Sequence, residues 1–370
     1  MTDTYTQLRK EVSQQFAAPI DMPIPDAVFN RLALAAHALQ MEQNGPYAAY
    51  CARRGRSEVD HWTEIPAVPT AAFKEVRLMV GNAEPEAVFR TSGTTRGWER
   101  RGQHFIRDLA LYHEALAPMF IAYLLPDNAK LSLYSLMPSA VELPDSSLAH
   151  MITFALERFG ADDSTFVVSR DDGLQYDSLL ERLHEHSARA EPVALLGTSL
   201  SFVHLLDTMH ERGDRLKLPE GSRLMDTGGF KGERRELSPT DLRAHYRERL
   251  RIEPLFAVNE YGMTELLSQF YDGGLRDLRL DRNVQTERKR IAPWVRTRAV
   301  HPDTLQPLPD GEVGLLQHFD LANIFSVCAI QTEDLGRVFA DGFELLGRAP
   351  GATPRGCSIA MDMLLQANRG

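Results

Sequence analysis

The sequence predicts an α/β fold, in which a core of parallel-rich sheets with flanking helices leads into a smaller β subdomain. Short apolar stretches alternate with stretches of helical periodicity through the middle of the chain. From about residue 275 the pattern changes to short alternating strands separated by glycine turns. With 370 residues and 43% hydrophobic content, the chain can form one large domain or two unequal ones.

The first 80 residues are predicted to be mainly helical. Residues 25–43 place apolar side chains at helical spacing, and Pro25 and Asp26 stand where a helix favours proline and an acidic side chain. Residues 61–80 mix prolines with aromatic side chains, which predicts a connector that enters a short helix or strand.

Strand and helix signals then alternate. We expect strands within residues 87–97, 130–139, 165–169, 192–199, 222–229 and 254–259. We expect helices within residues 108–125, 146–160, 176–190, 200–213 and 238–250. Serines cap two of these helices, Pro239 occupies a first helical position, and Gly213 closes a third helix. Such alternation predicts ligand-binding loops at the ends of parallel strands.

The last part of the chain is predicted to be antiparallel. Residues 310–321 and 325–348 carry the short strands, and the tail reads as a loop with one short helix. The expected organisation is therefore a helical region over 1–80, an α/β core over 81–345, and a C-terminal tail over 346–370 that carries Cys357.

Composition excludes several classes of function. A net charge of -10 argues against a nucleic-acid binder, which needs a broad basic face. No stretch approaches the ~18 apolar residues of a membrane span, and the N-terminus lacks the apolar core of a secretory signal, so we expect a cytoplasmic protein. The three cysteines form no CxxC pair, which predicts no structural zinc and no disulfide framework. Cys51 and Cys328 are predicted to be structural.

The stretch TSGTTRGWERRG, residues 91–102, concentrates hydroxyl groups, glycines and arginines. Glycine allows close approach of the backbone, and hydroxyl and N–H groups donate to anionic oxygens, so the stretch suits a phosphate chain. A plain solvated loop explains it as readily when it is taken alone. The P-loop pattern GxxxxGK[ST] is absent, which disfavours a standard NTPase.

Further motifs follow in a fixed order: DTGGFKG at 226–232, NEYGMTE at 259–265, QTEDLGR at 331–337 and LGR at 346–348. Together with TSGTT they resemble the adenylate-forming superfamily, which includes acyl-CoA ligases and phenylacetate-CoA ligase. The closer resemblance is to the LuxE acyl-protein synthetases of bacterial bioluminescence, through IPAVPTAAFK, MPSAVELPDSSLAHM, LMDTGGFKG and GRAPGATPRGCS. It covers the chain from about residue 60 to its end.

The resemblance implies a role for each motif residue. The β- and γ-phosphates of ATP would be held by Thr91, Ser92, Gly93, Thr94 and Thr95. The adenosine and its phosphates would be met by Gly228, Gly229, Tyr261, Gly262, Thr264, Asp334 and Arg348. Glu265 would hold Mg²⁺, a hard cation that prefers oxygen ligands. The implied reaction is attack of a carboxylate on the α-phosphorus with release of pyrophosphate.

Two departures from the superfamily stand out. Arg96 occupies the position where the loop usually continues with glycine, and it adds a cation there. No lysine follows Lys289, so the catalytic lysine that acyl-CoA ligases carry in a C-terminal lid domain has no counterpart. Lys231, Arg348 and Arg355 are the candidates to replace it. A lid reduced to a short stub is itself typical of LuxE proteins.

Cys357 lies in PRGCS, beside Arg355. A nearby cation lowers the pKa of a thiol and raises its thiolate fraction. The resemblance implies that this cysteine accepts the acyl group from the adenylate and passes it to a partner. The alternative is a small buried residue without a chemical role.

The sequence thus predicts a carboxylate-activating ligase that uses ATP and Mg²⁺ on an acid, with a fatty acid favoured. In the luminescent family the acyl acceptor is a reductase, whereas another protein or a small nucleophile stays open here. Two alternatives remain: a phenylacetate-like acyl-CoA ligase, which would be indifferent to Cys357→Ser, and a non-catalytic subunit that binds an adenylate or acyl group. The acid, the final acceptor and the oligomeric state have no readable signal.

Overall fold

The computed structural model describes residues 2–91, 101–228, 238–286 and 288–349, together with Met361 and Leu364. It confirms the mixed α/β class. Its contacts divide the chain into two compact units. The first comprises Met1–Met119, Met263–Phe270 and Arg288–Gly370, and the second comprises Phe120–Gly262 and Tyr271–Glu287. No helix in the described residues is long and apolar enough to cross a membrane.

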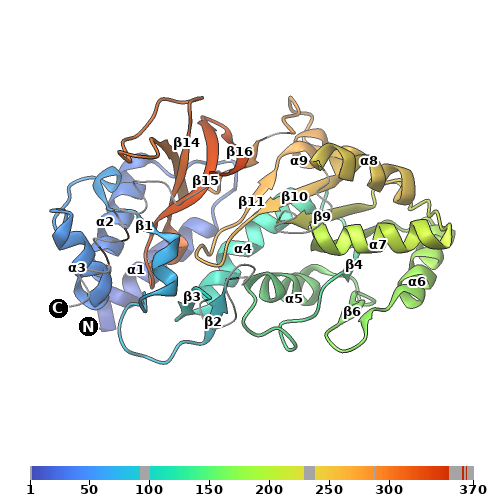
Figure 1. Cartoon of the computed structure of the whole chain (residues 1–370), viewed down its shortest axis with the longest axis horizontal. Helices are drawn as coiled ribbons and strands as arrows, with labels where there is room; N and C mark the ends of the chain where they lie inside the picture. The colour runs from blue at the N-terminus through green and yellow to red at the C-terminus, as the bar shows by residue number, and fades with distance from the viewer. Residues whose placement is uncertain are drawn as a thin grey trace. The chain divides into compact units, whose positions relative to one another are not determined.

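The N-terminal part of the first unit is helical. Its helices are α1 (Thr2–Phe16), α2 (Asp26–Gln43) and α3 (Gly45–Arg53), drawn in blue in Figure 1. Helix α2 begins directly after Pro25 and buries Phe29, Leu32 and Ala36, which follow the predicted helical spacing. The connector that follows holds strand β1 (Val68–Pro69) and the 3₁₀ helix η2 (Thr70–Lys74).

An antiparallel sheet completes the first unit and confirms the predicted β subdomain. Its strands are β12 (Lys289–Arg290), β13 (Val295–Val300), β14 (Val313–Asp320), β15 (Ala329–Phe339) and β16 (Gly342–Arg348). They lie in the order β13-β14-β15-β16-β12. The short β1 pairs with β15 in parallel, which the sequence did not indicate.

A separate hairpin in the first unit frames the stretch that opens at Thr91. Strand β2 (Ala87–Arg90) pairs antiparallel with β3 (Gln103–Ile106), with Phe89 opposite His104. The sequence predicted β2 but gave no signal for β3, because the four residues of β3 are too few to show a period.

The second unit holds the predicted parallel strands. These are β4 (Ser132–Ser135), β5 (Thr165–Phe166), β8 (Val193–Thr198), β9 (Arg223–Thr227) and β10 (Ala257–Tyr261), with β11 (Phe270–Asp272) beside β10. The parallel pairs are β5 with β4, β4 with β8, β8 with β9, and β9 with β10. One expected strand is wrong: residues 165–169 divide between β5 and β6 (Val168–Ser169), which pairs instead with β7 (Gly173–Leu174).

The helices of the second unit begin and end close to their predicted limits. They are α5 (Ser147–Phe159), α6 (Tyr176–Arg189), α7 (Ser199–Arg212), α8 (Pro239–Leu250) and α9 (Gly274–Arg279), while α4 (Leu109–Leu124) runs across the division between the units. Ser146 and Ser238 accept N-cap hydrogen bonds, and Gly213 ends α7 in the left-handed conformation. Helices α6, α7 and α8 lie along one side of the strands (Figure 1), where their apolar faces share one hydrophobic cluster with β8 and β9.

A buried ion pair ties β9 to the loop that follows α4. The Arg223 guanidinium is 1% exposed and donates to both carboxylate oxygens of Asp127, at 2.9 and 2.8 Å, and to the carbonyl of Leu124 at 3.0 Å. Burial alone would raise the pKa of Asp127, but the hydrogen bonds and charge of Arg223 outweigh it and lower the pKa.

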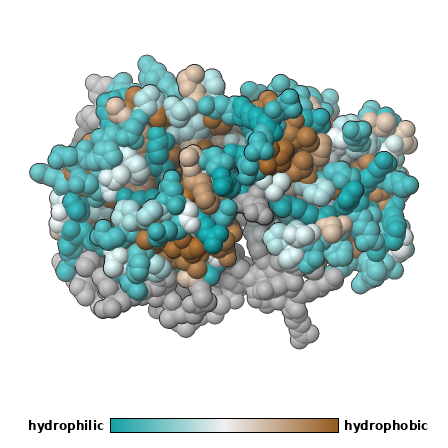
Figure 2. All heavy atoms as spheres, turned by 90° about the horizontal axis from the view of Figure 1, so that it is seen from above, coloured by the Kyte–Doolittle hydropathy of each residue, from teal (hydrophilic) through white to brown (hydrophobic). Residues whose placement is uncertain are grey.

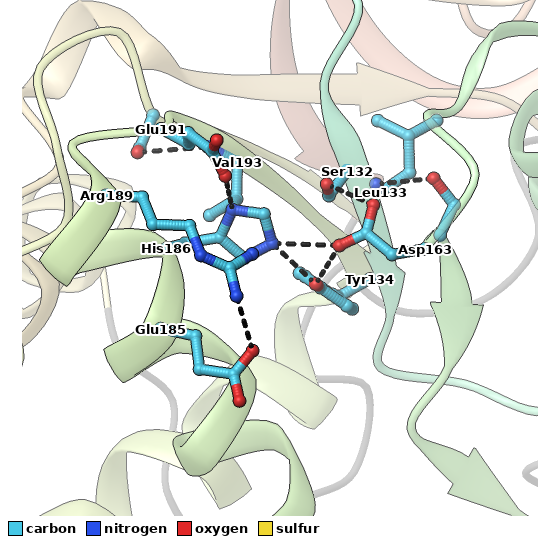
Figure 3. A network of polar contacts seen from close by, with 11 residues as sticks. Ser132, Leu133, Tyr134, Asp163, Glu185, His186, Arg189, Glu191 and Val193 are labelled. Carbon is cyan, nitrogen blue, oxygen red and sulfur yellow. Dashed lines mark hydrogen bonds and ion pairs between the residues drawn. The ribbon is translucent and has the colours of Figure 1, made fainter.

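A second polar network fixes the edge of the same sheet (Figure 3). His186 Nε2 lies 2.9 Å from both the hydroxyl of Tyr134 and a carboxylate oxygen of Asp163, while Ser132 donates to the other oxygen at 2.6 Å. Burial alone would raise the pKa of Asp163, but the hydrogen bonds from Ser132, His186 and Tyr134 lower it. Because the network joins β4, α6 and the segment before β5, we assign it to structure.

Candidate active site

The structure describes eight of the candidate residues. They are Thr91, Gly228, Tyr261, Gly262, Thr264, Glu265, Asp334 and Arg348. The other candidates lie outside the described residues: Ser92, Gly93, Thr94, Thr95, Gly229, Lys231 and Cys357, as do Arg96 and Arg355.

Gly228 and Tyr261 lie at the carboxyl ends of neighbouring parallel strands in the second unit. Strand β10 ends at Tyr261, and Gly228 directly follows β9 with a φ of 81°, a conformation that favours glycine. Among the residues that the structure describes, a Cβ on Gly228 would meet nothing within 4 Å. This is the edge at which open α/β sheets bind ligands.

Two cross-strand pairs fix these strand ends. Asn259 lies opposite Asp226 in the register and donates to its carboxylate at 2.6 Å, while Tyr246 of α8 donates to the other oxygen at 2.9 Å. One position further, Thr227 lies opposite Glu260 and donates to its buried carboxylate. These bonds hold β9 and β10 in register at the residues that precede the two candidate positions.

Gly262 leaves room for the side chain of Glu260. A Cβ added at Gly262 would lie 2.3 Å from Glu260 Oε1, closer than any real contact. The buried carboxylate therefore lies against the backbone at the turn of the YGMTE motif. A side chain at this position would require the Glu260 carboxylate to shift.

In the first unit, backbone contacts anchor Thr264 and Glu265. His104 Nδ1 lies 2.8 Å from the carbonyl of Thr264, and because a carbonyl only accepts, Nδ1 carries the proton. Burial lowers the pKa of His104 to about 4, so the ring is neutral at pH 7. Asn323 donates to the carbonyl of Glu265 at 2.8 Å and accepts from the amide of Leu267 at 3.0 Å.

Asp320 holds the same segment further along the chain, at Ser268. Its two carboxylate oxygens accept from the amide of Ser268 at 2.9 Å and from the Ser268 hydroxyl at 2.8 Å, and the indole of Trp294 donates to the same hydroxyl at 2.9 Å. Asp320 is 0% exposed, and burial raises its pKa to about 6 despite these hydrogen bonds.

The raised pKa makes stability depend on pH at this position. Protonation of Asp320 favours the folded state below the unfolded pKa of about 3.9, and this contribution is lost as the pH rises through 6. We expect the unfolding free energy of the wild type, relative to Asp320→Asn, to fall by about 2 kcal/mol from pH 4 to pH 7. Urea unfolding of both proteins across this range measures it. Parallel pH profiles of the two proteins would contradict the raised pKa of Asp320. A difference in unfolding free energy that is the same at every pH does not affect this comparison.

Thr91 pairs with Gly102 at the loop end of the β2–β3 hairpin. Its amide donates to the carbonyl of Gly102 at 3.0 Å, and its hydroxyl accepts from the Gly102 amide at 2.9 Å. A Cβ on Gly102 would lie 3.0 Å from the Thr91 methyl carbon, so the glycine allows this close pairing. The hydroxyl can still donate its own proton to an anionic oxygen.

Asp334 and Arg348 are brought together by strand pairing. They are opposite one another in the β15–β16 register, and Arg348 Nε lies 3.5 Å from an Asp334 carboxylate oxygen. The side chain of Asp334 is 15% exposed and that of Arg348 is 57% exposed. The acidic and basic candidates of the TED and LGR motifs therefore form one ion pair, in which Asp334 is half-buried and Arg348 is exposed.

The described part of the chain holds no group of three or more His, Cys, Asp and Glu side chains that would form a metal cage. A single carboxylate such as that of Glu265 still fits Mg²⁺, because this ion is often held by one or two carboxylates together with substrate phosphates. Cys51 and Cys328 are buried, and burial raises the pKa of each thiol to about 12. Their predicted structural role fits these positions, although Cys328 lies one residue before β15 rather than within it.

A comparison with known families decides the relationship. The family described as "Acyl-protein synthetase, LuxE" matches residues 21–366. The chain belongs to this family. LuxE proteins of this type are carboxylate-activating ligases, and the resemblance of the motifs is thereby confirmed.

One curated relative and two solved structures place the chain more closely. It is 24% identical over 355 residues to the long-chain-fatty-acid–luciferin-component ligase of Aliivibrio fischeri, covering 92% of this chain and 89% of that protein. The fold is similar to that of 2-hydroxyisobutyryl-CoA ligase in complex with 2-HIB-AMP, with 14% identity, a TM-score of 0.63, and coverage of 88% of this chain and 69% of that chain. ATP-bound MatB from Rhodopseudomonas palustris matches with 16% identity and a TM-score of 0.50. That match covers 73% of this chain but about half, 49%, of the MatB chain.

Sequence reasoning missed most of the residues that support the motifs of this LuxE protein. His104 belongs to none of the motifs, and the structure places it against the Thr264 carbonyl. Asp320 and Asn323 lie in no motif, and Glu260 lies within NEYGMTE but received no role there. The one available signal was a polar residue inside an otherwise apolar run, as in HFDLANIFSVCA, because such residues are retained where a buried partner needs them.

Proposed function

We propose that this LuxE protein activates a fatty acid with ATP, forms an acyl-adenylate, and transfers the acyl group through Cys357 to an acceptor. The observation that carries the proposal is the family match over residues 21–366, on a chain whose fold is similar to that of a 2-hydroxyisobutyryl-CoA ligase. A relative named as a long-chain-fatty-acid ligase supports the class of acid. A solved neighbour with bound ATP supports the nucleotide.

The first half-reaction requires a carboxylate oxygen to bond to the α-phosphorus while the bond from that phosphorus to pyrophosphate breaks. Its main cost is the approach of several negative charges, so fixed donors are the effective catalyst. We assign the ribose to Asp334 and the phosphates to Thr91 to Thr95, Thr264 and Arg348. Gly228, Gly229, Tyr261 and Gly262 would hold the adenine. Lys231 is a further candidate cation.

Glu265 would hold Mg²⁺, which would neutralise phosphate charge when it is bound. The structural support is the fixed backbone of this residue. Asn323 holds its carbonyl, and His104 holds the carbonyl of the preceding Thr264, so the Glu265 side chain starts from a defined position.

In the second half-reaction, the Cys357 thiolate would attack the acyl carbonyl carbon. A carbon–sulfur bond forms, and AMP leaves with the electron pair of the broken carbon–oxygen bond. Cys51 and Cys328 cannot easily take this role, because each is buried with a raised thiol pKa and thiolate is the nucleophile. A reductase is one candidate acceptor for the thioester.

The test combines exchange and labelling. We expect ATP–pyrophosphate exchange to depend on a fatty acid, chosen from a panel of acetate, aromatic acids and fatty acids of increasing length. We expect Cys357→Ser to keep this exchange and to lose a covalent label from radioactive fatty acid that is sensitive to hydroxylamine. Cys51→Ser and Cys328→Ser are the matched controls and should keep the label.

Other outcomes point to the alternatives. Product formation that requires coenzyme A and survives Cys357→Ser would indicate an acyl-CoA ligase. Absence of exchange with every acid, in folded protein that binds ATP, would overturn the proposed activity and leave a binding subunit.

His104 is proposed as a positioning residue for this reaction. We expect His104→Leu to leave the Thr264 carbonyl without its donor and to lower the exchange rate about tenfold. His104→Asn places an amide donor near the position of Nδ1 and should restore most of the rate. Steady-state exchange at varied ATP, with thermal unfolding alongside, separates this role from simple destabilisation. Equal rates in both variants at equal stability would contradict it.

A further inference from the structure

A cavity in the second unit has no role in the reaction proposed above. It lies among α8, α9 and the start of β10, and its volume is about 620 Å³. This is within the range of pockets that hold small molecules, about 300–1,000 Å³. Figure 2 shows an apolar surface bordered by hydrophilic residues in the right-hand part of the view, where α8 and α9 lie in Figure 1.

The cavity is separate from the strand ends that carry the nucleotide motifs. It is lined by Ala257 and Val258, the first two residues of β10, whereas Tyr261 ends that strand. At a rise of about 3.3 Å per residue, Val258 and Tyr261 are roughly 10 Å apart along the strand. A ligand in the cavity therefore need not touch the adenylate motifs.

The floor of the cavity is apolar. Pro254, Leu255, Ala257, Val258 and Leu275 all line it. Removal of the apolar surface of the cavity from water by a ligand is favourable, by about 25 cal/mol per Å². The floor thus suits an alkyl chain, and a volume of 620 Å³ holds roughly twenty water-sized groups.

The charged lining contains two arginines, Arg243 and Arg247, which can donate to a carboxylate. The two acidic side chains already face cations: Asp272 accepts from Arg243 at 2.6 Å, and Glu248 lies 3.4 Å from Arg215. Within the described residues, Arg243 donates a single hydrogen bond, so most of its five N–H groups remain for a ligand.

A second arginine lies one helical turn further on the same face of α8. Arg247 lines the cavity four residues after Arg243, and its side chain is 64% exposed. Its partner Glu253, at 3.2 Å, is 53% exposed. Exposed pairs of this kind contribute little, so Arg247 can exchange its partner for a ligand anion at small cost.

We propose that this cavity is a second binding site, specific for an amphiphile with a carboxylate head and a medium-length alkyl chain. The chain lies on the apolar floor, and the head meets Arg243 and Arg247. The site goes beyond the proposed activity, because no residue that lines it belongs to the adenylate motifs. A free fatty acid and the anionic face of a lipid bilayer share this chemistry.

The test is calorimetric titration of the full chain with decanoate. We expect Ala244→Trp, which fills the cavity from α8, to lose one equivalent of bound decanoate relative to the wild type. We expect Arg247→Ala to weaken that equivalent about tenfold, as for the loss of one charge-assisted hydrogen bond. Decanol, which lacks the charge, should bind at least tenfold more weakly than decanoate.

Arg189→Ala is the matched control. Arg189 lies on α6 of the same unit, its side chain is 60% exposed, and it pairs with Glu185, which is 56% exposed, but it does not line the cavity. Its decanoate binding should equal that of the wild type. Vesicles of phosphatidylglycerol distinguish the two sources: a free carboxylate site predicts no sedimentation of the chain with vesicles.

Several outcomes would overturn the site. Wild-type stoichiometry in Ala244→Trp, decanol as tight as decanoate, or vesicle binding that Arg247→Ala removes while decanoate binding persists would each do so. Different variants test the second binding site and the proposed activity. Both cavity variants should keep pyrophosphate exchange, whereas Glu265→Gln should lose exchange and keep the decanoate equivalent that Ala244→Trp removes.

Discussion

Glu265→Gln is expected to lower fatty-acid-dependent ATP–pyrophosphate exchange by at least about a hundredfold, the scale on which a single electrostatic group contributes to such steps. Glutamine keeps the size of the side chain and removes the charge that would hold Mg²⁺. Glu265 is 7% exposed, and its backbone is held by Asn323, so the substitution changes the charge without releasing the segment. Exchange rates at several Mg²⁺ concentrations measure the effect.

The control for this variant is Glu333→Gln. Glu333 is a partly exposed carboxylate beside Asp334, and its side chain lies 3.8 Å from Arg348, yet it has no assigned role in the reaction. It should retain exchange within a few fold. A Glu265→Gln protein with wild-type exchange and an unchanged Mg²⁺ requirement would remove this residue from the site.

Arg223→Met should cost about 3 kcal/mol of unfolding free energy, the lower end of the range for breaking a buried ion pair. The substitution leaves the carboxylate of Asp127 without its bidentate partner, and that side chain is only 23% exposed. Because Asp127 keeps some contact with solvent and lies 3.4 Å from Arg279, the cost should not reach the upper end. Denaturant unfolding at pH 7 measures it.

A double variant separates the ion pair from the packing of the arginine. In Arg223→Met with Asp127→Leu, no charge is left unpaired, so the loss should be smaller than in Arg223→Met alone. The exposed Arg189→Ala is the surface control and should change stability by less than about 0.5 kcal/mol. Additive losses in the double variant would show that the two residues act independently.

The main elements of the fold were predictable because they repeat a local signal. The helix over Asp26–Gln43 shows its apolar face at the right spacing, and caps such as Ser238 mark where helices begin. Short elements were not predictable. Strand β3 has four residues and β6 has two, so neither shows a period, and the pairing of β1 with β15 joins segments more than 250 residues apart in the chain.

In the candidate site, too, some residues were predictable from the sequence and others were not. The motifs themselves are contiguous letters, so resemblance finds Tyr261, Thr264 and Glu265. The residues that hold these motifs come from other parts of the chain: His104 from β3, and Asp320 and Asn323 from the end of β14 and the turn after it. Their function is a contact with a distant backbone, and such contacts have no local pattern.

The register of the β2–β3 hairpin positions residues of two sequence motifs at once, TSGTT and NEYGMTE. One strand leads to Thr91, which closes the hairpin against Gly102, and the other strand carries His104, which holds the carbonyl of Thr264. A one-residue insertion within β3 would turn His104 to the opposite face of the hairpin and break the Thr91–Gly102 pairing in the same step. Such an insertion would therefore disturb two motifs that lie more than 160 residues apart in the sequence. A change in the length of the loop between β2 and β3 need not change the register of the two strands.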